Sequence, residues 1–323
     1  MDTALASPWH AGEVALQRTV GMAERMDELG RKVIRGFMPE QHRAFFGQLP
    51  FVVLGAVDAA GDAWATLRAG RPGFLHSPDP QRLRAALPRE PQDPAEAGLQ
   101  DGDAVGLLGI ELHTRRRNRM NGVLRRSGAD GFEVDVRQSF GNCPQYIQLR
   151  DYAFVEQPQA APVELGALDG EARALIGAAD SFYVATYAEV AGKSASAERQ
   201  VDVSHRGGKP GFVRLNADGT LTIPDFQGNM FFNTLGNIAL NGRAGLVFVD
   251  FASGGLLQMS GTAALLDGAE AAAGLAAFDG AERLWRFTPQ RLVRRAHALP
   301  LRWFAQDNGA SPASLRTGAW PAA

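Results

Sequence analysis

The chain has 323 residues, of which 45% are hydrophobic and 21% charged, and its formal net charge is −2 at pH 7. This length is typical of two domains of ordinary size, and the composition is that of a globular protein with a core. The small net charge gives no case for nucleic acid or an anionic membrane surface as the main partner. Arginine is abundant, but lysine occurs only at Lys32, Lys193 and Lys209. This bias is typical of GC-rich codon usage, so the arginine content by itself predicts no function.

The single cysteine, Cys143, excludes an intrachain disulfide and fits a reducing compartment. The first residues lack the basic region and apolar core of a secretory signal, and no apolar run approaches the roughly 20 residues of a membrane helix. We therefore expect a cytoplasmic protein that binds neither nucleic acid nor membrane. The motifs GxGxxG, Walker A, GxSxG, HExxH and CxxC are absent, and the histidines lack metal-ligand spacing. A bound organic cofactor, and no metal, is the natural source of chemistry.

The predicted elements begin with a helix at residues 39–48, where Pro39 suits a first helical turn. An apolar, β-branched strand follows at 51–57, then a buried strand at 106–112 and a strand returning into Met120. The same series recurs with a helix at 169–178, strands at 182–187 and 245–251, and a strand returning into Met259. Many short strands without βαβ alternation predict a mainly β fold with peripheral helices, of the α+β class.

Two blocks of sequence repeat in the same order. The block beginning at Arg68 (RAGRPGFL) recurs 138 residues later at Arg206 (RGGKPGFV). The block at Gly106 recurs 139 residues later at Gly245, and each copy is followed by a Met-x-Gly. We therefore predict a duplication into two domains, residues 1–157 with a helical lead-in and residues 158–323. The two prolines of 156–168 mark the linker, the two methionines are expected in the cores, and residues 296–304 are expected to close the second domain.

Three segments of the second half carry a resemblance to a known family: VSHRGGKPGFVR from Val203, IPDFQGN from Ile223 and NTLGNI from Asn233. Together with SFGNCPQYI from Ser139, they resemble the pyridoxamine 5′-phosphate oxidase-like FMN-binding split barrels over most of the chain. The resemblance implies two tandem split β-barrels, with FMN in a groove to which both contribute. It implies a cofactor site made of Ser204, His205, Arg206, Gly207, Asn229, Asn233, Thr234 and Asn237.

The residue chemistry supports this expectation independently. A guanidinium such as that of Arg206 suits the dianionic phosphate of FMN, although it could instead pair with Asp202 or Asp225. The turn at Gly228 precedes a predicted helix over 230–240, whose free N–H groups favour an anion. Gly207 permits close backbone approach. The asparagines and Thr234 could also be plain turn and cap residues, and His205 an ordinary exposed strand histidine.

The first half departs from this pattern. It keeps Arg68 but has Thr66 and Leu67 where the second half has Ser204 and His205, and a Pro-rich, charged stretch precedes Gly106. We expect its own phosphate site to be degenerate, so that it supplies the opposite wall of a single site. Cys143 precedes a proline at an expected helix start, where a thiol pKa can fall, but free cysteines are often simply buried. Its redox role is left open.

The resemblance implies a flavin-dependent oxidoreductase whose FMN accepts electrons from a small-molecule substrate or a reduced nicotinamide. No carboxylate pair or His–Asp pair indicates acid–base catalysis, so the catalytic residues and the substrate stay unknown. A flavin-binding protein without turnover, and a barrel that binds haem or a deazaflavin, share the same fold. Dimerisation of the chain is left open.

Overall fold

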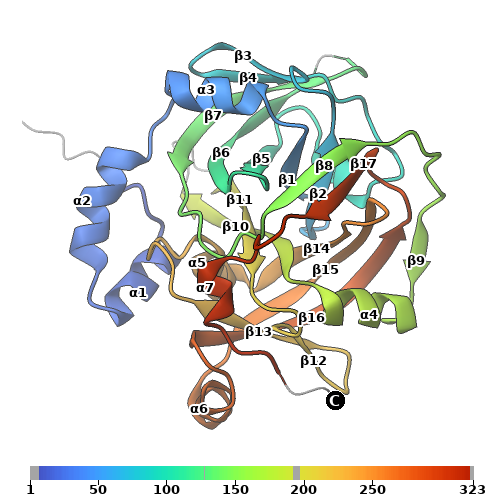
Figure 1. Ribbon diagram of the computed structural model, residues 1–323. Coiled ribbons are helices and arrows are strands. Elements are labelled where there is room, and N and C mark those ends of the chain that lie inside the picture. Colours follow the sequence, from blue (N-terminus) through green and yellow to red (C-terminus); the bar gives the residue numbers. More distant parts are fainter. Residues whose placement is uncertain (1–6, 127, 192–196, 321–323) are drawn as a thin grey trace, which may run out of the picture.

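The structure is a computed structural model that describes residues 7–126, 128–191 and 197–320. Two antiparallel sheets form its centre, and helices lie mainly around their outside (Figure 1). The chain begins with three helices, α1 (Ala11–Thr19), α2 (Ala23–Val33) and α3 (Glu40–Gly47). The helix α3 agrees with the helix predicted at 39–48, with Pro39 as its N-cap residue.

The first unit is the sheet of strands β1 to β7, in the order β2-β1-β5-β6-β7-β4-β3. Its strands are β1 (Phe51–Val57), β2 (Ala63–Ala69), β3 (Leu75–Asp79), β4 (Arg82–Ala85), β5 (Ala104–Glu111), β6 (Arg116–Arg125) and β7 (Phe132–Gly141). A short 3-10 helix, η1 (Pro94–Gly98), lies between β4 and β5.

The second unit is the sheet ordered β11-β10-β14-β15-β16-β13-β12, with β9 added beside β16. Its strands are β9 (Val163–Leu165), β10 (Ser181–Ala191), β11 (Ala197–Gly207), β12 (Arg214–Leu215), β13 (Leu221–Phe226), β14 (Arg243–Asp250), β15 (Gly255–Leu265) and β16 (Ala281–Arg295). Each strand of the first order corresponds to the strand numbered nine higher in the second. The predicted fold class, mainly β with peripheral helices and two barrel-type sheets in tandem, is therefore confirmed.

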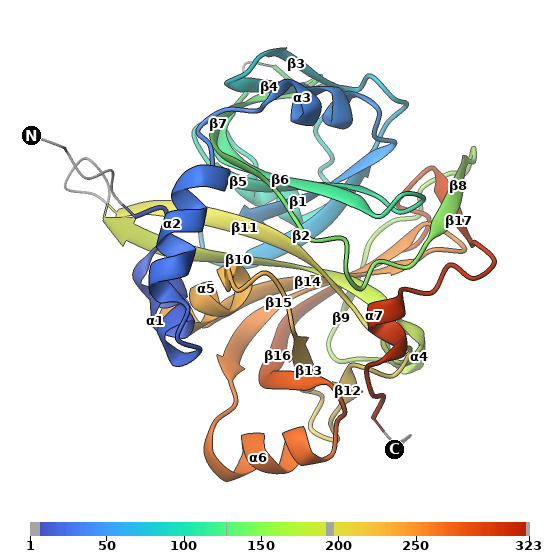
Figure 2. The same cartoon turned by 60° about the vertical axis from the view of Figure 1, so that its left-hand side comes forward.

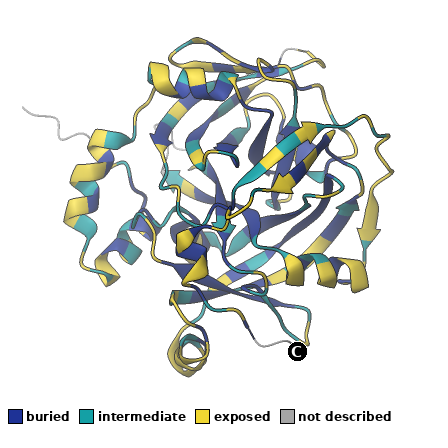
Figure 3. Ribbon diagram, viewed as in Figure 1, coloured by how far each residue is buried: buried dark blue, intermediate teal, exposed yellow. Residues whose placement is uncertain are grey.

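The remaining helices border the second unit and the end of the chain. They are α4 (Gly170–Ala178), α5 (Asn233–Asn241), α6 (Gly268–Ala276) and α7 (Pro312–Leu315). Burial is concentrated in the central strands, whereas the outer helix faces are exposed (Figure 3). Within the described ranges, no helix has both the length and the apolar character needed to cross a membrane.

The two units pack face to face through strands that are buried on both sides. In β1, Val52 and Leu54 belong to the first unit's own core, whereas Phe51 and Val53 pack in a cluster that contains Tyr183 of the second unit. This alternation follows from the period of two along a strand. Met120 and Met259 are both fully buried in the two separate cores, as predicted.

Equivalent glycines allow the backbones of the two units to approach closely. A Cβ atom on Gly106 would lie 2.8 Å from the carbonyl oxygen of Val201, and one on Gly245 would lie 2.2 Å from that of Ala63. Val201 also lies 138 residues after Ala63, the same spacing as between Arg68 and Arg206. The start of β5 therefore contacts β11 in the same way as the start of β14 contacts β2, as in an isologous interface.

One expectation about the end of the chain was wrong. Residues 296–304 do not close the second sheet, because β17 (Leu301–Ala305) pairs with β8 (Arg150–Phe154) in a separate two-stranded sheet. Trp303 is held there by edge-on contacts with Phe51 and Phe251, each at 5.5 Å between ring centroids. The expected linker also contains β9, which pairs with β16. The division into domains at residues 157 and 158 stays a prediction.

Candidate functional site

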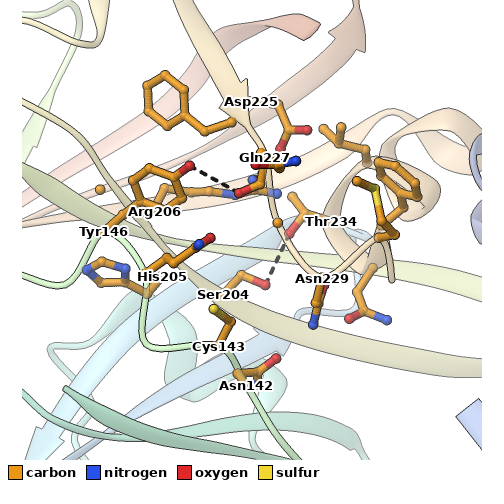
Figure 4. A pocket seen from close by; sticks show the side chains of 18 of the residues that line it. Asn142, Cys143, Tyr146, Ser204, His205, Arg206, Asp225, Gln227, Asn229 and Thr234 are labelled. Carbon is orange, nitrogen blue, oxygen red and sulfur yellow. Dashed lines mark hydrogen bonds and ion pairs between the residues drawn. The ribbon is translucent and has the colours of Figure 1, made fainter. Parts of the chain in front are cut away.

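A cavity lies between the two units and is built from both (Figure 4). The first unit contributes Arg117 and Arg119 of β6, and the segment after β7 contributes Asn142, Cys143 and Tyr146. From the second unit come residues 204–207 of β11, the loop that follows β13, and the first turn of α5. Seven of the eight predicted cofactor residues line this cavity: Ser204, His205, Arg206, Gly207, Asn229, Asn233 and Thr234.

The helix α5 begins at the cavity, but three residues later than predicted. Met230 and Phe232 have positive φ angles of 62° and 59°, so the chain is left-handed at these positions and cannot yet be helical. The predicted helix start at Met230 was therefore wrong, and α5 starts at Asn233. The N-cap residue Phe232 offers no side-chain acceptor to the first turn. The N–H groups at this end favour an anion, and Asn233 and Thr234 line the cavity beside them.

Arg119 crosses from the first unit into the polar wall of the second. Its guanidinium forms an ion pair with Asp202 at 3.1 Å and donates hydrogen bonds to Asn233 Oδ1 at 2.7 Å and to Ser204 Oγ. Thr234 Oγ1 donates to Ser204 Oγ at 3.1 Å, so both hydroxyl groups lie together beside the start of α5 (Figure 4). Hydroxyl groups, a guanidinium and a helix N-terminus thus meet in one wall.

Arg206 pairs with Asp225, one of the two carboxylates predicted from the sequence as its alternative partners. Its guanidinium pairs with Asp225 at 2.5 Å, and Arg283 lies 3.6 Å from the other oxygen of that carboxylate. The pair sits at the cavity wall with about a fifth of the Arg206 side chain exposed. Asp225 therefore offsets the charge of Arg206, and a bound anion would share this guanidinium with it.

His205 is buried, not an exposed strand residue. Only 6% of it is accessible, and its ring meets that of Tyr183 edge-on at 5.5 Å between centroids. Desolvation, together with the positive charge of Arg117, holds the pKa of His205 well below its ordinary value. The imidazole is therefore neutral at pH 7, which removes it as a proton donor of the imidazolium type.

Several buried polar atoms at the cavity are without partners in the described part of the chain. They are Nε of Arg119, Nε of Arg206, Nδ2 of Asn142 and the two ring nitrogens of His205. Buried polar groups are normally hydrogen-bonded, so these atoms call for a ligand or water. Most of them are donors, which fits a ligand rich in acceptor oxygen and nitrogen atoms, as a flavin phosphate is.

Two predicted residues serve the framework. Asn237 is fully buried behind the cavity wall, where its Nδ2 donates to Thr186 and Asp202 and its Oδ1 accepts a hydrogen bond from His10 Nε2. Gly207 does line the cavity, but a Cβ there would lie 2.2 Å from the carbonyl oxygen of Tyr146. The glycine therefore admits the segment after β7, which places Tyr146 at the site.

Cys143 lies in an irregular segment and not at a helix start, so that expectation was wrong. Its carbonyl oxygen accepts a hydrogen bond of 2.6 Å from Arg117 Nε, and the residue is half-buried at the cavity. Burial, followed by the charge of Arg119, lowers the pKa of Arg117 to about 10, so it remains a cation at pH 7.

Sequence reasoning missed Arg117, Arg119 and the N-terminal helix. Met120 faces the core, so the alternation along β6 turns Arg119 to the opposite face, toward the second unit. That signal was readable. Glu13 of α1 accepts a hydrogen bond from Asn233 Nδ2, and burial, with the charge of Asp202 next, raises its pKa to about 8. No local pattern points from Glu13 to a residue so distant in the chain.

The equivalent region of the first unit is filled by the chain's own carboxylates. Arg68 contacts Glu90 at 2.9 Å and Glu96 at 3.2 Å, and Arg295 contacts Asp93 at 3.1 Å. These acids come from the Pro-rich stretch that distinguishes the first half, and the Asp93 side chain is fully buried. Arg68 thus has several carboxylate partners from its own unit, whereas Arg206 pairs with Asp225 alone among the described residues.

Comparisons with known proteins give structural neighbours only. No family model matches the chain, and no curated protein matches it. Among solved structures, a protein of the pyridoxinephosphate oxidase family from Clostridium acetobutylicum is 16% identical, covering 43% of this chain and 94% of its own, with a TM-score of 0.25. The FAD binding protein from Mycobacterium smegmatis is 14% identical over 42% and 98%, with a TM-score of 0.24. HupZ of Group A Streptococcus is 17% identical over 44% and 97%, with a TM-score of 0.28.

Proposed function

We propose that this protein is an FMN-dependent oxidoreductase with one flavin site per chain, in the cavity between the two units. The observation that carries the proposal is the single wall where the start of α5, the hydroxyl groups of Ser204 and Thr234, and Arg119 meet. A terminal phosphate suits each of these groups, because hydroxyl and backbone N–H groups can donate hydrogen bonds to its oxygen atoms and a guanidinium is always charged.

The chain's own residues would divide the work of holding FMN. Ser204, Thr234 and the first turn of α5 would hold the phosphate, with Arg119 and Arg206 supplying positive charge. The unpartnered polar atoms of Asn142 and His205 would serve the remaining polar atoms of the cofactor. Tyr146, whose hydroxyl group donates to the carbonyl oxygen of Gln227 at 3.1 Å, would cover one side and exclude water.

A bound flavin supplies the two-electron chemistry, and the protein supplies binding, orientation and electrostatics. The residues at the cavity include no paired acid and base: His205 is held neutral, and Asp225 is bound to Arg206 and Arg283. The catalytic residues and the electron donor therefore remain open, with a reduced nicotinamide or a small-molecule substrate as candidates. A cytoplasmic location also remains a proposal.

The absorption spectrum of the purified protein tests the proposal. A band near 450 nm (roughly, as for any bound flavin), with FMN released on denaturation, is expected. Anaerobic addition of NADPH or NADH should bleach this band if the protein is an enzyme that uses these donors. A flavin that no donor reduces would indicate a carrier, and a Soret band would replace the flavin assignment with haem. Absence of FMN binding in calorimetry would overturn the proposal.

A further inference from the structure

A second cavity adjoins the proposed flavin site. It lies between α2 and the loop before α5, and its lining includes Cys143, Gly228, Asn229 and Met230, which also line the first cavity. The two cavities are therefore neighbours that share one wall. Figure 2 shows α2 and α1 side by side at the edge of the second unit, next to α5.

The walls of this second cavity are apolar. Met26, Leu29 and Val33 of α2 and its N-cap residue Met22 form one side, and Met230 and Phe231 come from the facing loop. Methionine side chains adapt to flat or irregular apolar ligands, because they are unbranched and polarizable. Leu29 is 37% exposed, so part of this surface is open to solvent.

Two arginines give the cavity a positive rim. Arg25 and Arg35 both line it and both are exposed. Across the ranges that the structure describes, the side chains of Arg25 and Arg35 form no hydrogen bond or ion pair. By contrast, Arg68 of the first unit and Arg295 at the end of β16 are both paired with carboxylates. Two unpaired guanidinium groups above an apolar floor match a ligand with an anionic end and a flat or aliphatic body.

We propose that the cavity beside α2 binds the substrate of the flavin site, a small organic anion whose apolar body lies among the methionines and whose charge lies at Arg25 and Arg35. That the bound anion is a substrate rests on the proposed function. That the cavity binds such an anion does not. The shared wall would bring the bound molecule next to whatever occupies the first cavity. The positive rim would also favour anions over neutral molecules of the same shape.

The test uses two aromatic probes that differ in charge. 8-Anilinonaphthalene-1-sulfonate carries a sulfonate, and N-phenyl-1-naphthylamine has the same ring system without it. Both are titrated into the full chain by fluorescence, with and without saturating FMN. The variants are Arg25→Gln with Arg35→Gln, and Lys32→Gln as the control, because Lys32 lies on the same helix without lining the cavity.

The double variant should bind the sulfonate roughly tenfold more weakly, a change of about 1.4 kcal/mol, and the neutral probe as well as before. Lys32→Gln should change neither affinity by more than about twofold, and FMN should not displace the sulfonate. Equal sulfonate binding in the double variant, or competition with FMN, would overturn the proposal. FMN titration of the same variants, expected to be unchanged, keeps failure of the flavin site distinguishable from failure of this one.

Discussion

Arg119 in β6 and Asn233 at the start of α5 are joined by a hydrogen bond of 2.7 Å, although they lie 114 residues apart in the chain. The same guanidinium pairs with Asp202 and donates to Ser204. The polar wall of the candidate site therefore exists only when the two units are docked. Ligand binding and the docking of the units should stabilise each other, because a ligand of the native state stabilises that state by mass action.

The hydroxyl group of Thr234 gives the most direct test of the phosphate position. Thr234→Val keeps the shape of the side chain but removes a donor that points to Ser204 beside α5. Since a hydrogen bond to a charged group contributes about 1.5–3 kcal/mol, FMN should bind at least about tenfold more weakly. Riboflavin, which lacks the phosphate, should bind the variant and the natural chain alike in calorimetry. Thr288→Val, at an exposed position of β16, is the control, and an equal loss for riboflavin would contradict the assignment.

Arg206 and Arg68 form a matched pair, because they occupy corresponding positions of the repeat but have different partners. Arg206→Ala should weaken FMN about tenfold or more, with little change in stability, since a partly exposed pair with Asp225 is lost. Arg68→Ala should leave FMN affinity unchanged but cost about 3–5 kcal/mol of folding stability, because Glu90 and Glu96 lose their buried cation.

Urea unfolding and fluorescence titration measure these two effects separately. If Arg68→Ala does not fold, Arg68→Lys serves as the milder variant. An equal loss of FMN at both positions would mean that the first unit also holds a cofactor.

Glu13 should make the stability of the protein depend on pH. Its folded pKa of about 8 exceeds the ordinary value of 4.5, mainly through burial, so between these values the folded state binds more protons than the unfolded state. Stability from this group is complete below about pH 4.5 and is lost as the pH rises toward 8. Glu13→Gln lacks this dependence.

The stability of Glu13→Gln relative to the natural chain should therefore rise by more than about 2 kcal/mol from pH 5 to pH 8, since one pKa unit corresponds to about 1.4 kcal/mol. Denaturant unfolding at several pH values measures this difference. A constant difference across that range would show that Glu13 ionises normally in the folded chain.

The contact between the units can be tested at Gly245. A Cβ atom there would lie 2.2 Å from the carbonyl oxygen of Ala63, which belongs to a strand backbone and cannot move independently. Gly245→Ala should therefore destabilise the protein by about 3 kcal/mol, the upper part of the range for overpacking. Gly166→Ala has open space around its Cβ and should be nearly neutral. Similar unfolding midpoints for the two variants would show that the units are not closely docked.

Local patterns predicted the elements whose causes are local. The run at 51–57 is the strand β1, the helix expected at 169–178 is α4 with Asp169 as its N-cap, and both repeated methionines are buried. Pairing between distant segments could not be predicted from local sequence patterns. Nothing near residue 301 indicates that β17 joins β8, and the left-handed backbone at Met230 and Phe232 is set by its tertiary surroundings.

In the candidate site, too, contacts between distant parts of the chain were the harder ones to predict. The residues of β11 and of the loop after β13 were predicted from the resemblance of their segments to a known family, and seven of the eight predicted residues line the cavity. Arg119 was missed although the alternation along β6 points it toward the second unit, whereas Glu13 and His10 were missed because their partners Asn233 and Asn237 lie far along the chain. Whether the predicted residues bind a flavin is the question that the variants above address.

Because both units lie in one polypeptide, a substitution in one unit need not occur in the other. In a dimer of identical chains, every substitution appears twice. Carboxylates such as those of Glu90 and Asp93 would then occupy the equivalent region of both subunits. Here a change near Arg68 is not copied at Arg206, and one half can acquire a rigid, ion-paired interior while the other half keeps an open cavity. The carboxylates around Arg68 are therefore a variation that a dimer of identical chains could not confine to one half.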